Sequence, residues 1–308
     1  MKVFVTGATG VLGRGSVTRL VAAGHEVRGV ARGDQKAAWL RDHGAEPVDV
    51  DLFDAESVLD AVQGSEAVAH LATNVPPLSR FGWPSAWKTH NRLRAEATPL
   101  LVDAAVATGA TVFVKESVCF FYADAGDALI DESAPMVSGK LIEPTLVGER
   151  AVERMNDDGG RGIVLRFGFF YGAGARGVDE SLKLARVGSS TIAGKREGYL
   201  PSIHLDDAAD AVVAAVERAP GGIYNVCDEA VTKAEYLRAF AEAFDLKHAP
   251  RPIPTAALRV APGSPSYLAG SQRTSNARFK AATGWEPAYR SVIEGWPAVA
   301  VAKRAQRA

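Results

Sequence analysis

The sequence has little of several features that mark specialised classes of protein. Its two cysteines, Cys119 and Cys227, are far apart and give no disulfide framework. The longest apolar stretches, such as Leu100–Ala107 with its Asp103, are shorter than the roughly 20 residues that cross a bilayer. No signal-peptide pattern opens the chain. These absences predict a cytoplasmic protein with no membrane partner.

The chain also has no large excess of positive or negative charge. The 35 Lys and Arg residues are scattered and nearly balance 36 Asp and Glu, so the basic footprint of nucleic-acid binding is absent. No His or Cys pair has metal-ligand spacing, which predicts no metal site, and His204 is interpreted as a structural hydrogen-bonding residue. No Gly-x-Ser-x-Gly elbow supports a hydrolase. The remaining composition is that of a globular protein with a large core.

The first half of the chain alternates apolar strands with helices. Strands are predicted at 2–6, 27–31, 46–50, 66–71 and 111–115. Helices are predicted at 12–23, 35–43, from a cap at Asp54 to Gly64, and at 85–108 with an interruption near Pro99 and a stop at Gly109. Strands and helices joined by short connections predict a parallel sheet with helices on both faces.

After residue 120 the loops lengthen. Strands are predicted at 162–167 and 223–226, and helices at 206–217 and 275–282, the latter stopped at Gly284. Thr232 and Glu235 form a capping box for a helix that ends near Phe244. We therefore expect an α/β Rossmann fold, with a doubly wound parallel sheet in residues 1–168 to which the strand at 223–226 returns. Residues 169–308 are expected to form a smaller, interleaved substrate lobe.

The most specific motif is the run Thr6-Gly7-Ala8-Thr9-Gly10-Val11-Leu12-Gly13 between a predicted strand and a predicted helix. Gly7 allows a tight turn, Gly10 lets the backbone approach a pyrophosphate, and Gly13 lets the helix pack on the sheet. The helix N-terminus then offers N–H groups to the phosphates, including those near Thr9, Val11 and Leu12. The alternative is a glycine turn without a ligand. The motif favours a bound dinucleotide.

The end of the second predicted strand indicates which dinucleotide is bound. An acidic residue at this point would bind the ribose 2′-hydroxyl of NAD, but Arg32 stands there instead. A guanidinium suits the 2′-phosphate of NADP. The alternatives are a solvated Arg32 and an influence of the neighbouring Asp34. We predict NADP(H) in preference to NAD(H).

Further segments in the same order carry a family resemblance. They are Asp51-Leu52, His70-Leu71-Ala72-Thr73, Asn91, Arg166-Phe167-Gly168-Phe169-Phe170-Tyr171-Gly172, His204-Leu205-Asp206-Asp207-Ala208, and Ser275-Asn276-Ala277 with Thr283-Gly284-Trp285. With the glycine loop, they make nearly the whole chain similar to the extended and atypical short-chain dehydrogenase/reductases, also called NAD-dependent epimerase/dehydratases. The resemblance implies cofactor contacts from Asp51, Leu52, Leu71, Ala72, Thr73, Phe167 and Gly168.

The chain departs from this family at the catalytic residues. Family enzymes carry a Ser after the fifth strand, and a Tyr and a Lys four residues apart on a helix. Ser117 is kept, but alignment of the helix places Thr145 at the Tyr and Glu149 at the Lys. Tyr122 and Lys140 lie nearby without a partner at the family's spacing. Some atypical members without the pair still reduce ketones of aromatic polyketides, so Ser117 is predicted to orient a carbonyl. The alternative is a Ser117 hydroxyl satisfied within the protein.

Aromatic residues follow the fourth and fifth predicted strands. Phe81, Trp83, Trp87, Phe120, Phe121 and Tyr122 are expected in loops that face the cleft, where they line a substrate pocket or pack between lobes. The loops 74–90, 120–143 and 170–200 would enclose the substrate. We predict an NADP(H)-dependent ketoreductase of a bulky or aromatic ketone, in a possible homodimer. The alternatives are a non-catalytic dinucleotide-binding sensor or scaffold, and a sugar-nucleotide epimerase or dehydratase.

Overall fold

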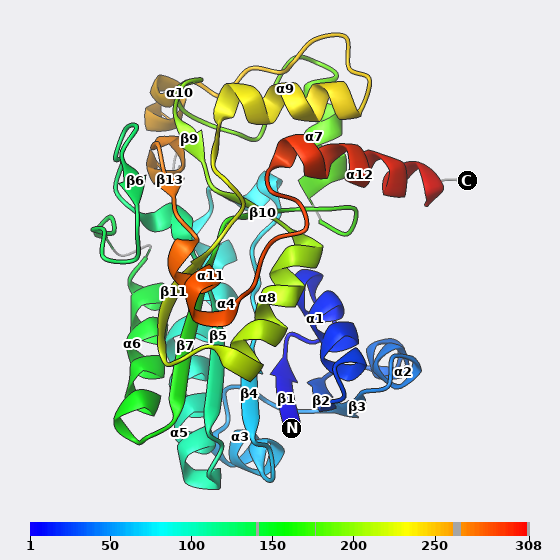
Figure 1. Cartoon of the computed structure of the whole chain (residues 1–308), viewed down its shortest axis with the longest axis vertical. Helices are drawn as coiled ribbons and strands as arrows, with labels where there is room; N and C mark the ends of the chain where they lie inside the picture. Colours follow the sequence, from blue (N-terminus) through cyan, green and yellow to red (C-terminus); the bar gives the residue numbers. More distant parts are fainter. Residues whose placement is uncertain (140–141, 176, 261–265, 307–308) are drawn as a thin grey trace.

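A parallel seven-stranded sheet forms the centre of the computed structural model, which describes residues 1–139, 142–175, 177–260 and 266–306 (Figure 1). Its strands are β1 (Lys2–Thr6), β2 (Glu26–Val30), β3 (Glu46–Val48), β4 (Ala67–His70), β5 (Val112–Val118), β7 (Arg161–Phe167) and β11 (Gly222–Val226). The order is β11-β7-β5-β4-β1-β2-β3, with every neighbouring pair parallel. The order changes direction between β1 and β4, where open α/β sheets bind ligands. The predicted Rossmann fold is confirmed.

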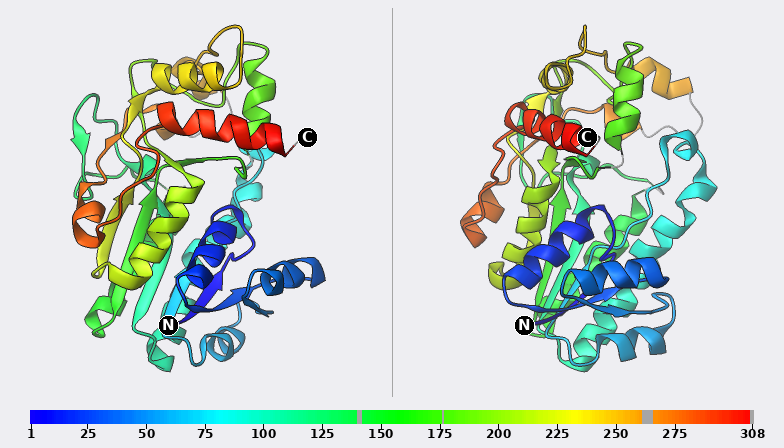
Figure 2. Two further views of the ribbon diagram at one scale, coloured as in Figure 1. Left: turned by 45° about the vertical axis from the view of Figure 1, so that its right-hand side comes forward. Right: turned by 90° about the vertical axis from the view of Figure 1, so that its right-hand side faces the viewer.

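Helices cover both faces of the sheet (Figure 2). They are α1 (Val11–Ala22), α2 (Asp34–Asp42), α3 (Ala55–Val62), α5 (Thr98–Thr108), α6 (Glu143–Asp157), α8 (Leu205–Arg218) and α11 (Ala277–Thr283). On one face α1 and α8 bury a core that includes Leu20 and Val212. On the other face α3, α5 and α6 bury a core that includes Leu101 and Val152. All seven residues of β5 are buried, as expected for a strand covered on both sides.

Local capping signals set several helix ends as predicted. Asp54 accepts a hydrogen bond from the Ser57 N–H at the start of α3. Gly109 and Gly284 end α5 and α11 in the left-handed conformation, with φ of 77° and 68°. The Thr232–Glu235 capping box is present at the start of α9 (Lys233–Ala243). These predictions are confirmed because capping depends on a few neighbouring residues.

The predicted helix at 85–108 is a chain of shorter pieces. A 3-10 turn at Pro84–Trp87 leads into α4 (Lys88–Arg92), a π-helical turn at Leu93–Ala97, and then α5. Pro99 stands in the first turn of α5, where its missing N–H is tolerated. The Thr98 hydroxyl donates to the Leu93 carbonyl, 3.1 Å away, across the π-helical turn. The predicted interruption near Pro99 is therefore confirmed, and the irregular turn lies just before the proline.

The C-terminal segments lie above the carboxyl ends of the sheet strands (Figures 1 and 2). The helices there are α7 (Gly177–Ala185), α9, α10 (Thr255–Val260) and α12 (Val292–Ala305). Short strand pairs join them: β8 (Phe169–Tyr171) with β10 (Ser202–His204), β9 (Tyr199–Leu200) with β12 (Val231–Thr232), and β6 (Leu129–Ile130) with β13 (Arg273–Thr274). Their own core includes Tyr171, Leu182, Phe240 and Trp296.

The sequence interpretation missed α12. Pro297 stands inside this helix and weakens its sequence signal, whereas Trp296, Val299 and Ala300 form a buried face against the lobe. The two lobe boundaries remain predictions, and Lys140 lies outside the described residues. Within the described residues, no helix combines the length and apolarity needed to cross a membrane.

Candidate functional site

The glycine loop joins β1 to α1 at the point where the strand order changes direction. Gly7 has a φ of +70°, and a Cβ on it would lie 2.7 Å from the Ala72 backbone beyond β4. A Cβ on Gly13 would lie only 2.0 Å from the Gly7 carbonyl oxygen. The Gly10 N–H donates to that oxygen at 2.8 Å and closes the turn. Side chains at Gly7 and Gly13 are therefore excluded by the backbone itself.

The start of α1 has the character of an anion site. Gly10 is its N-cap and has no side chain with which to cap it. Within the described part of the chain, no side chain accepts a hydrogen bond from the first N–H groups of the helix. Thr9 and Val11 are half-buried beside it, whereas the Leu12 side chain is buried in the sheet core. Leu12 is thus placed to offer a ligand its backbone but not its side chain.

A buried histidine fixes the strand ends beside this loop. The Thr6 hydroxyl lies 2.6 Å from Nδ1 of His70 on β4, and Nε2 of His70 lies 3.2 Å from the Leu93 carbonyl. Burial lowers the pKa of His70 to about 3, with a further contribution from Lys115, so the ring is neutral. A neutral ring donates from Nε2 to the carbonyl and accepts at Nδ1 from the hydroxyl. β1, β4 and the π-helical turn are thereby joined.

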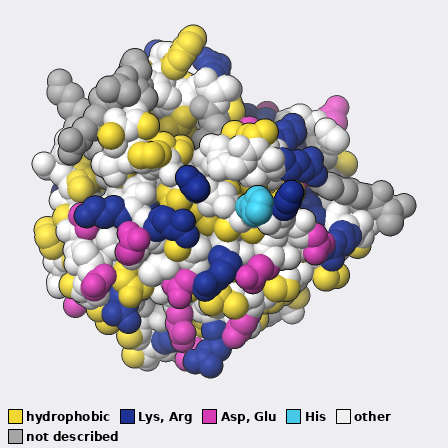
Figure 3. Space-filling view, turned by 90° about the horizontal axis from the view of Figure 1, so that it is seen from above, with side chains coloured by type: hydrophobic (Ala, Val, Ile, Leu, Met, Phe, Trp, Pro, Cys, Tyr) yellow, Lys and Arg dark blue, Asp and Glu magenta, His cyan; other side chains and the backbone are white. Residues whose placement is uncertain are grey.

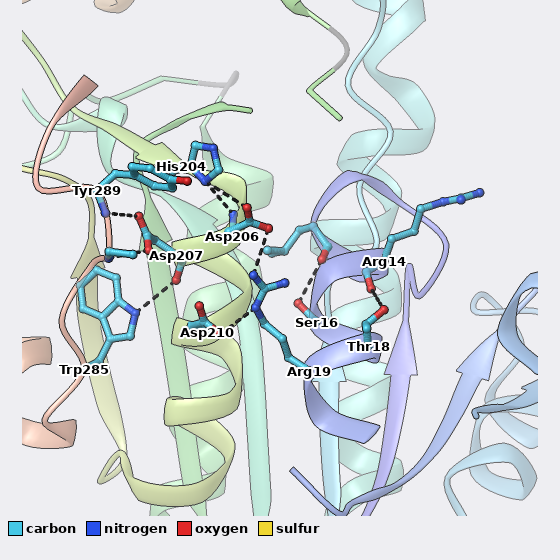
Figure 4. Close-up of polar contacts among 12 residues, drawn as sticks. Arg14, Ser16, Thr18, Arg19, His204, Asp206, Asp207, Asp210, Trp285 and Tyr289 are labelled. Atoms are coloured by element: carbon cyan, nitrogen blue, oxygen red, sulfur yellow. Dashed lines mark hydrogen bonds and ion pairs between the residues drawn. The ribbon is translucent and has the colours of Figure 1, made fainter. Parts of the chain in front are cut away.

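Two ion pairs hold α1 against α8 (Figure 4). Arg19 contacts Asp206 at 3.0 Å and Asp210 at 2.7 Å, both on α8. The His204 ring caps α8 by accepting from the Asp206 N–H at 3.2 Å, which confirms its structural interpretation. Asp207 accepts backbone N–H bonds from the segment after α11. These contacts connect the glycine-loop helix to the C-terminal part of the chain.

Two arginines lie on segments next to the end of β2, where the adenosine ribose of a dinucleotide lies in Rossmann folds. Arg32 is exposed after β2, next to Gly33 with a φ of +85°, and has no ion pair among the described residues. Arg14 on α1 was missed in the sequence interpretation. Its guanidinium lies 4.6 Å from the Trp39 ring centroid, and its side chain extends away from α8 (Figure 4). An Arg directly after the third glycine of the loop was the available signal.

The remaining predicted cofactor residues follow β3 and β4. Asp51 is exposed and accepts from the Phe53 N–H at 2.9 Å, and Leu52 is half-buried against the core. Leu71 is buried, Ala72 is half-buried against Gly7, and Thr73 is exposed. These residues border the same strand ends as the glycine loop.

Phe167 and Gly168 end β7 on the other side of that edge. Phe167 is fully buried, and a Cβ on Gly168 would lie 2.8 Å from the Ser202 backbone on β10. Gly168 therefore allows β7 to continue into β8 beside β10 without a side chain between them.

Ser117, Glu149 and Arg166 form a buried polar cluster across β5, α6 and β7. The Ser117 hydroxyl donates to Oε1 of Glu149 at 2.5 Å. Arg166 donates to both carboxylate oxygens, from Nε at 3.1 Å and from an Nη at 2.6 Å. All three side chains are buried. Glu149, at the position that the helix alignment gives to the family's Lys, therefore lies beside Ser117. The negative charge of Glu149 is balanced by the positive charge of Arg166.

The cluster continues toward β11. Arg166 donates at 2.8 Å to the hydroxyl of the fully buried Tyr122, which donates at 2.8 Å to the Asn225 side-chain oxygen. Burial works to lower the pKa of Arg166, but hydrogen bonds and charge from Glu149 outweigh it and raise the pKa overall. Burial also raises the pKa of Tyr122 far above its ordinary value. Tyr122 is therefore a neutral structural partner and holds no proton for release near neutrality.

A second buried charge cluster lies behind Ser117. Arg94, in the π-helical turn, forms an ion pair of 2.9 Å with Glu116. The Lys115 ammonium donates to the Glu116 carbonyl at 2.9 Å and passes beneath Gly148 on α6. Burial, with a further contribution from Arg94, lowers the pKa of Lys115 to about 7. In the sequence, Lys115 and Glu116 are charged residues within an otherwise apolar strand. Buried charges need partners, so this pattern could have indicated the cluster.

Thr145 stands one helical turn before Glu149, with 2% of its surface exposed. Among the described residues its hydroxyl has no hydrogen-bond partner. No hydrogen bond joins it to a basic side chain of the described residues, whereas a Lys serves the Tyr of the family. The geometry therefore supplies no means of ionising Thr145.

Aromatic side chains border the strand ends above Ser117 and Gly168. Phe120 stacks on Phe169 with ring centroids 4.4 Å apart and an interplanar angle of 17°. Phe121 meets Tyr267 from the C-terminal lobe edge-to-face at 4.9 Å. Both Phe120 and Phe169 are half-buried. Phe169 packs against the core of the C-terminal lobe, and Phe120 packs against the cluster that contains Val118 and Phe121. We call Phe120 and Phe169 the stacked pair.

Comparison with known proteins identifies the family. The model of the NAD dependent epimerase/dehydratase family matches residues 3–227, so the chain belongs to this family. A 3-diazoavenalumate denitrifying reductase of Streptomyces sp. is 33% identical, over 96% of this chain and 99% of its own. A 4-hydroxy-2-methyl-3-oxo-4-farnesyl-3,4-dihydroquinoline-1-oxide ketoreductase of Stigmatella aurantiaca is 28% identical, over 85% of this chain and 78% of its own.

A solved structure shares the architecture of the whole chain. The crystal structure of a human epimerase family protein with NADPH superposes with a TM-score of 0.80 and 25% identity, covering 98% of this chain and 99% of that one. With the family and the reductase relatives, it defines the chain as an NAD(P)-dependent oxidoreductase of the short-chain dehydrogenase/reductase type.

Proposed function

We propose that the protein is an NADP(H)-dependent reductase of a bulky aromatic ketone that works without a tyrosine acid. NADPH supplies a hydride to the carbonyl carbon when it is bound. The observation that carries the proposal is the stacked pair, whose members follow Ser117 and Gly168 in the chain at the carboxyl ends of β5 and β7. The glycine loop follows β1 at the same edge of the parallel sheet. Hydride and proton addition together convert the ketone to an alcohol.

The cofactor side of the proposal rests on the fit of the loop. Gly7 and Gly13 leave no space for a Cβ, and α1 begins without a side-chain cap, as a pyrophosphate site requires. Arg14 and Arg32 make no ion pair with a described carboxylate. Nε of Arg14 donates to the Thr9 carbonyl at 3.2 Å, so the terminal Nη groups of Arg14 and the guanidinium of Arg32 are left for a 2′-phosphate. This arrangement and the NADPH of the human relative both favour NADP(H).

The proposed substrate class rests on the apolar side chains near the stacked pair. Phe120 and Phe169 offer flat rings, and the neighbouring cluster adds Val118, Ile142 and Leu146. An aromatic ketone inserted beside these side chains would gain offset stacking and burial. The reductase names of two relatives agree with this reaction type.

The proton route follows from the polar cluster. The Ser117 hydroxyl has one hydrogen, which it donates to Glu149. Ser117 can therefore donate a hydrogen bond to a substrate carbonyl oxygen only after the hydroxyl turns away from that carboxylate. Glu149 remains satisfied after such a turn because Arg166 keeps two hydrogen bonds to it. We propose that Ser117 orients the carbonyl in this way, and that water or a hydroxyl on the substrate delivers the proton to the oxygen.

The test follows NADPH absorbance with purified protein and two ketones, a polycyclic aromatic ketone and cyclohexanone. A UDP-sugar is incubated separately with the protein and NAD⁺, and its products are separated by chromatography, because epimerisation leaves the amount of cofactor unchanged. We expect oxidation with the aromatic ketone, little with cyclohexanone, and no epimerised sugar. Phe120→Ala should raise KM for the aromatic ketone more than Phe120→Leu, because Leu keeps apolar volume without a flat face. Sugar epimerisation without ketone reduction would refute the proposal. Tight NADPH binding without turnover of any aromatic ketone would instead support a non-catalytic dinucleotide sensor.

A further inference from the structure

A separate cavity of about 590 Å³ lies in the C-terminal lobe. Three segments far apart in the sequence form it: the end of α7, the residues 244–248 after α9, and the last turns of α12. None of its lining residues belongs to the glycine loop, the polar cluster or the stacked pair. The proposed reductase site therefore does not explain this cavity.

The floor of the cavity is apolar. Leu182 and Ala185 on α7 and Ala300 on α12 are buried beneath it, and Phe244 and Leu246 are half-buried at its side. These side chains give a small organic body a surface on which its apolar area leaves water.

The rim carries unpaired positive charge. Arg186 and Lys247 are exposed, line the cavity, and make no ion pair with any described carboxylate. His248 stands beside them on the rim. The face seen from above shows Lys and Arg side chains near a histidine, with apolar side chains around them (Figure 3).

Two further cations on the rim are already paired. Lys303 contacts Asp179 at 2.9 Å, and Arg304 contacts Asp245 at 2.7 Å. Four lining cations thus face two carboxylates, which leaves two positive charges before His248 is counted. The imbalance lies over an apolar floor, so one site offers both charge and hydrophobic contact.

We propose that this cavity is a binding site for a small organic anion. The apolar body of the ligand rests on Leu182, Ala185 and Ala300, and its anionic head faces Arg186 and Lys247. A cation is disfavoured by the net charge, and a neutral apolar molecule leaves the two cations without a partner. The site is independent of the reductase proposal.

The test uses naphthoate as the probe, titrated calorimetrically into the full chain without added nucleotide. The matched variants described below separate binding in this cavity from binding in the cofactor cleft. Naphthamide serves as the uncharged probe of the same shape, and inorganic phosphate as the anion without an apolar body. We expect naphthoate to bind at least about tenfold more tightly than either, because only naphthoate combines both contacts.

Matched variants locate the binding. Arg186→Ala with Lys247→Ala removes the two unpaired rim cations, which are exposed and therefore dispensable for folding. The control is Lys183→Ala with Arg238→Ala, which removes two exposed cations from α7 and α9 that do not line the cavity. The first double variant should weaken naphthoate binding by about tenfold, and the control should leave it within about twofold.

Each contrary outcome overturns the proposal. Equal weakening by both double variants would mean general charge attraction, and no weakening by Arg186→Ala with Lys247→Ala would place naphthoate elsewhere. Equal affinity for naphthamide would mean that the negative charge of the ligand does not contribute to binding. Equal affinity for phosphate would mean that the apolar floor does not contribute. Absence of naphthoate binding at millimolar concentration would overturn it outright.

Discussion

Replacing Glu149 with Gln should destabilise the protein by about 3–5 kcal/mol, the usual cost of removing one partner of a buried ion pair. Glu149 and Arg166 are 3% and 5% exposed, and two hydrogen bonds of 3.1 and 2.6 Å join them. Glu149→Gln keeps the shape of the side chain and an oxygen for the Ser117 hydroxyl. The change removes the negative charge beside the Arg166 guanidinium, and it also replaces one of the two oxygens that accept from Arg166 with an NH2 donor.

The magnitude follows from the electrostatics of the pair. Unit charges about 4 Å apart attract each other by about 4 kcal/mol at the effective dielectric constant that suits protein sites. Arg166 would keep its charge in a buried site after the substitution, with the Tyr122 hydroxyl as its remaining strong partner. Removing both charges should be much cheaper than the sum of the single changes, because neither partner is then left unpaired.

The assay is a double-mutant cycle of Glu149→Gln and Arg166→Met, with free energies of unfolding from urea denaturation at neutral pH. We expect a coupling of at least about 2 kcal/mol. The control is Glu143→Gln, which breaks the Glu143–Arg150 pair on the same helix. That pair has a similar distance of 2.7 Å, but both side chains are 57% exposed. Its loss should cost less than about 1 kcal/mol.

Two results would refute this reasoning. Additive effects of Glu149→Gln and Arg166→Met, within about 0.5 kcal/mol, would mean that the pair is not energetically coupled. A cost of Glu149→Gln no larger than that of Glu143→Gln would mean that burial does not strengthen the interaction.

Three further predictions concern charge, cofactor and proton. The pKa of Lys115 is about 7 when folded and 10.5 in the reference state, so the unfolded chain binds more protons between these values and stability rises with pH. Urea denaturation at pH 7 and pH 9 should show the wild type gaining about 2 kcal/mol relative to Lys115→Met, and equal pH dependence of the two proteins would contradict the shift. Arg32→Asp should weaken NADPH relative to NADH by about tenfold or more in cofactor titrations, whereas Arg41→Asp, which changes an exposed Arg of α2, should not; tighter NADH binding by the wild type would count against the assignment. Once a substrate is found, Thr145→Val should keep most of kcat and Ser117→Ala should lose more, though less than the roughly 10²–10⁴-fold that a general acid supplies; a thousandfold loss in Thr145→Val with intact folding would make Thr145 the acid.

Local signals allowed much of the fold to be predicted from the sequence. The alternation of strands and helices, the capping residues Asp54 and Thr232, and the stops at Gly109 and Gly284 act over a few residues, and the structure contains all of them. Features that depend on distant packing were predicted only in part, as for the interruption near Pro99, or not at all, as for α12. The π-helical turn before Pro99 and the helix around Pro297 are stabilised by neighbours that the local sequence does not reveal.

The sequence by itself determined the dinucleotide-binding class of the chain, because its glycine loop includes Gly7 and Gly13, where the backbone leaves no space for a side chain. It also determined that the family's Tyr and Lys are missing. Only the tertiary structure decided what replaces them: Glu149 meets Ser117 from 32 residues away and Arg166 from 17. Which buried charge has a partner, and which cavity forms between α7, α9 and α12, depends on segments that meet only when the whole chain has folded.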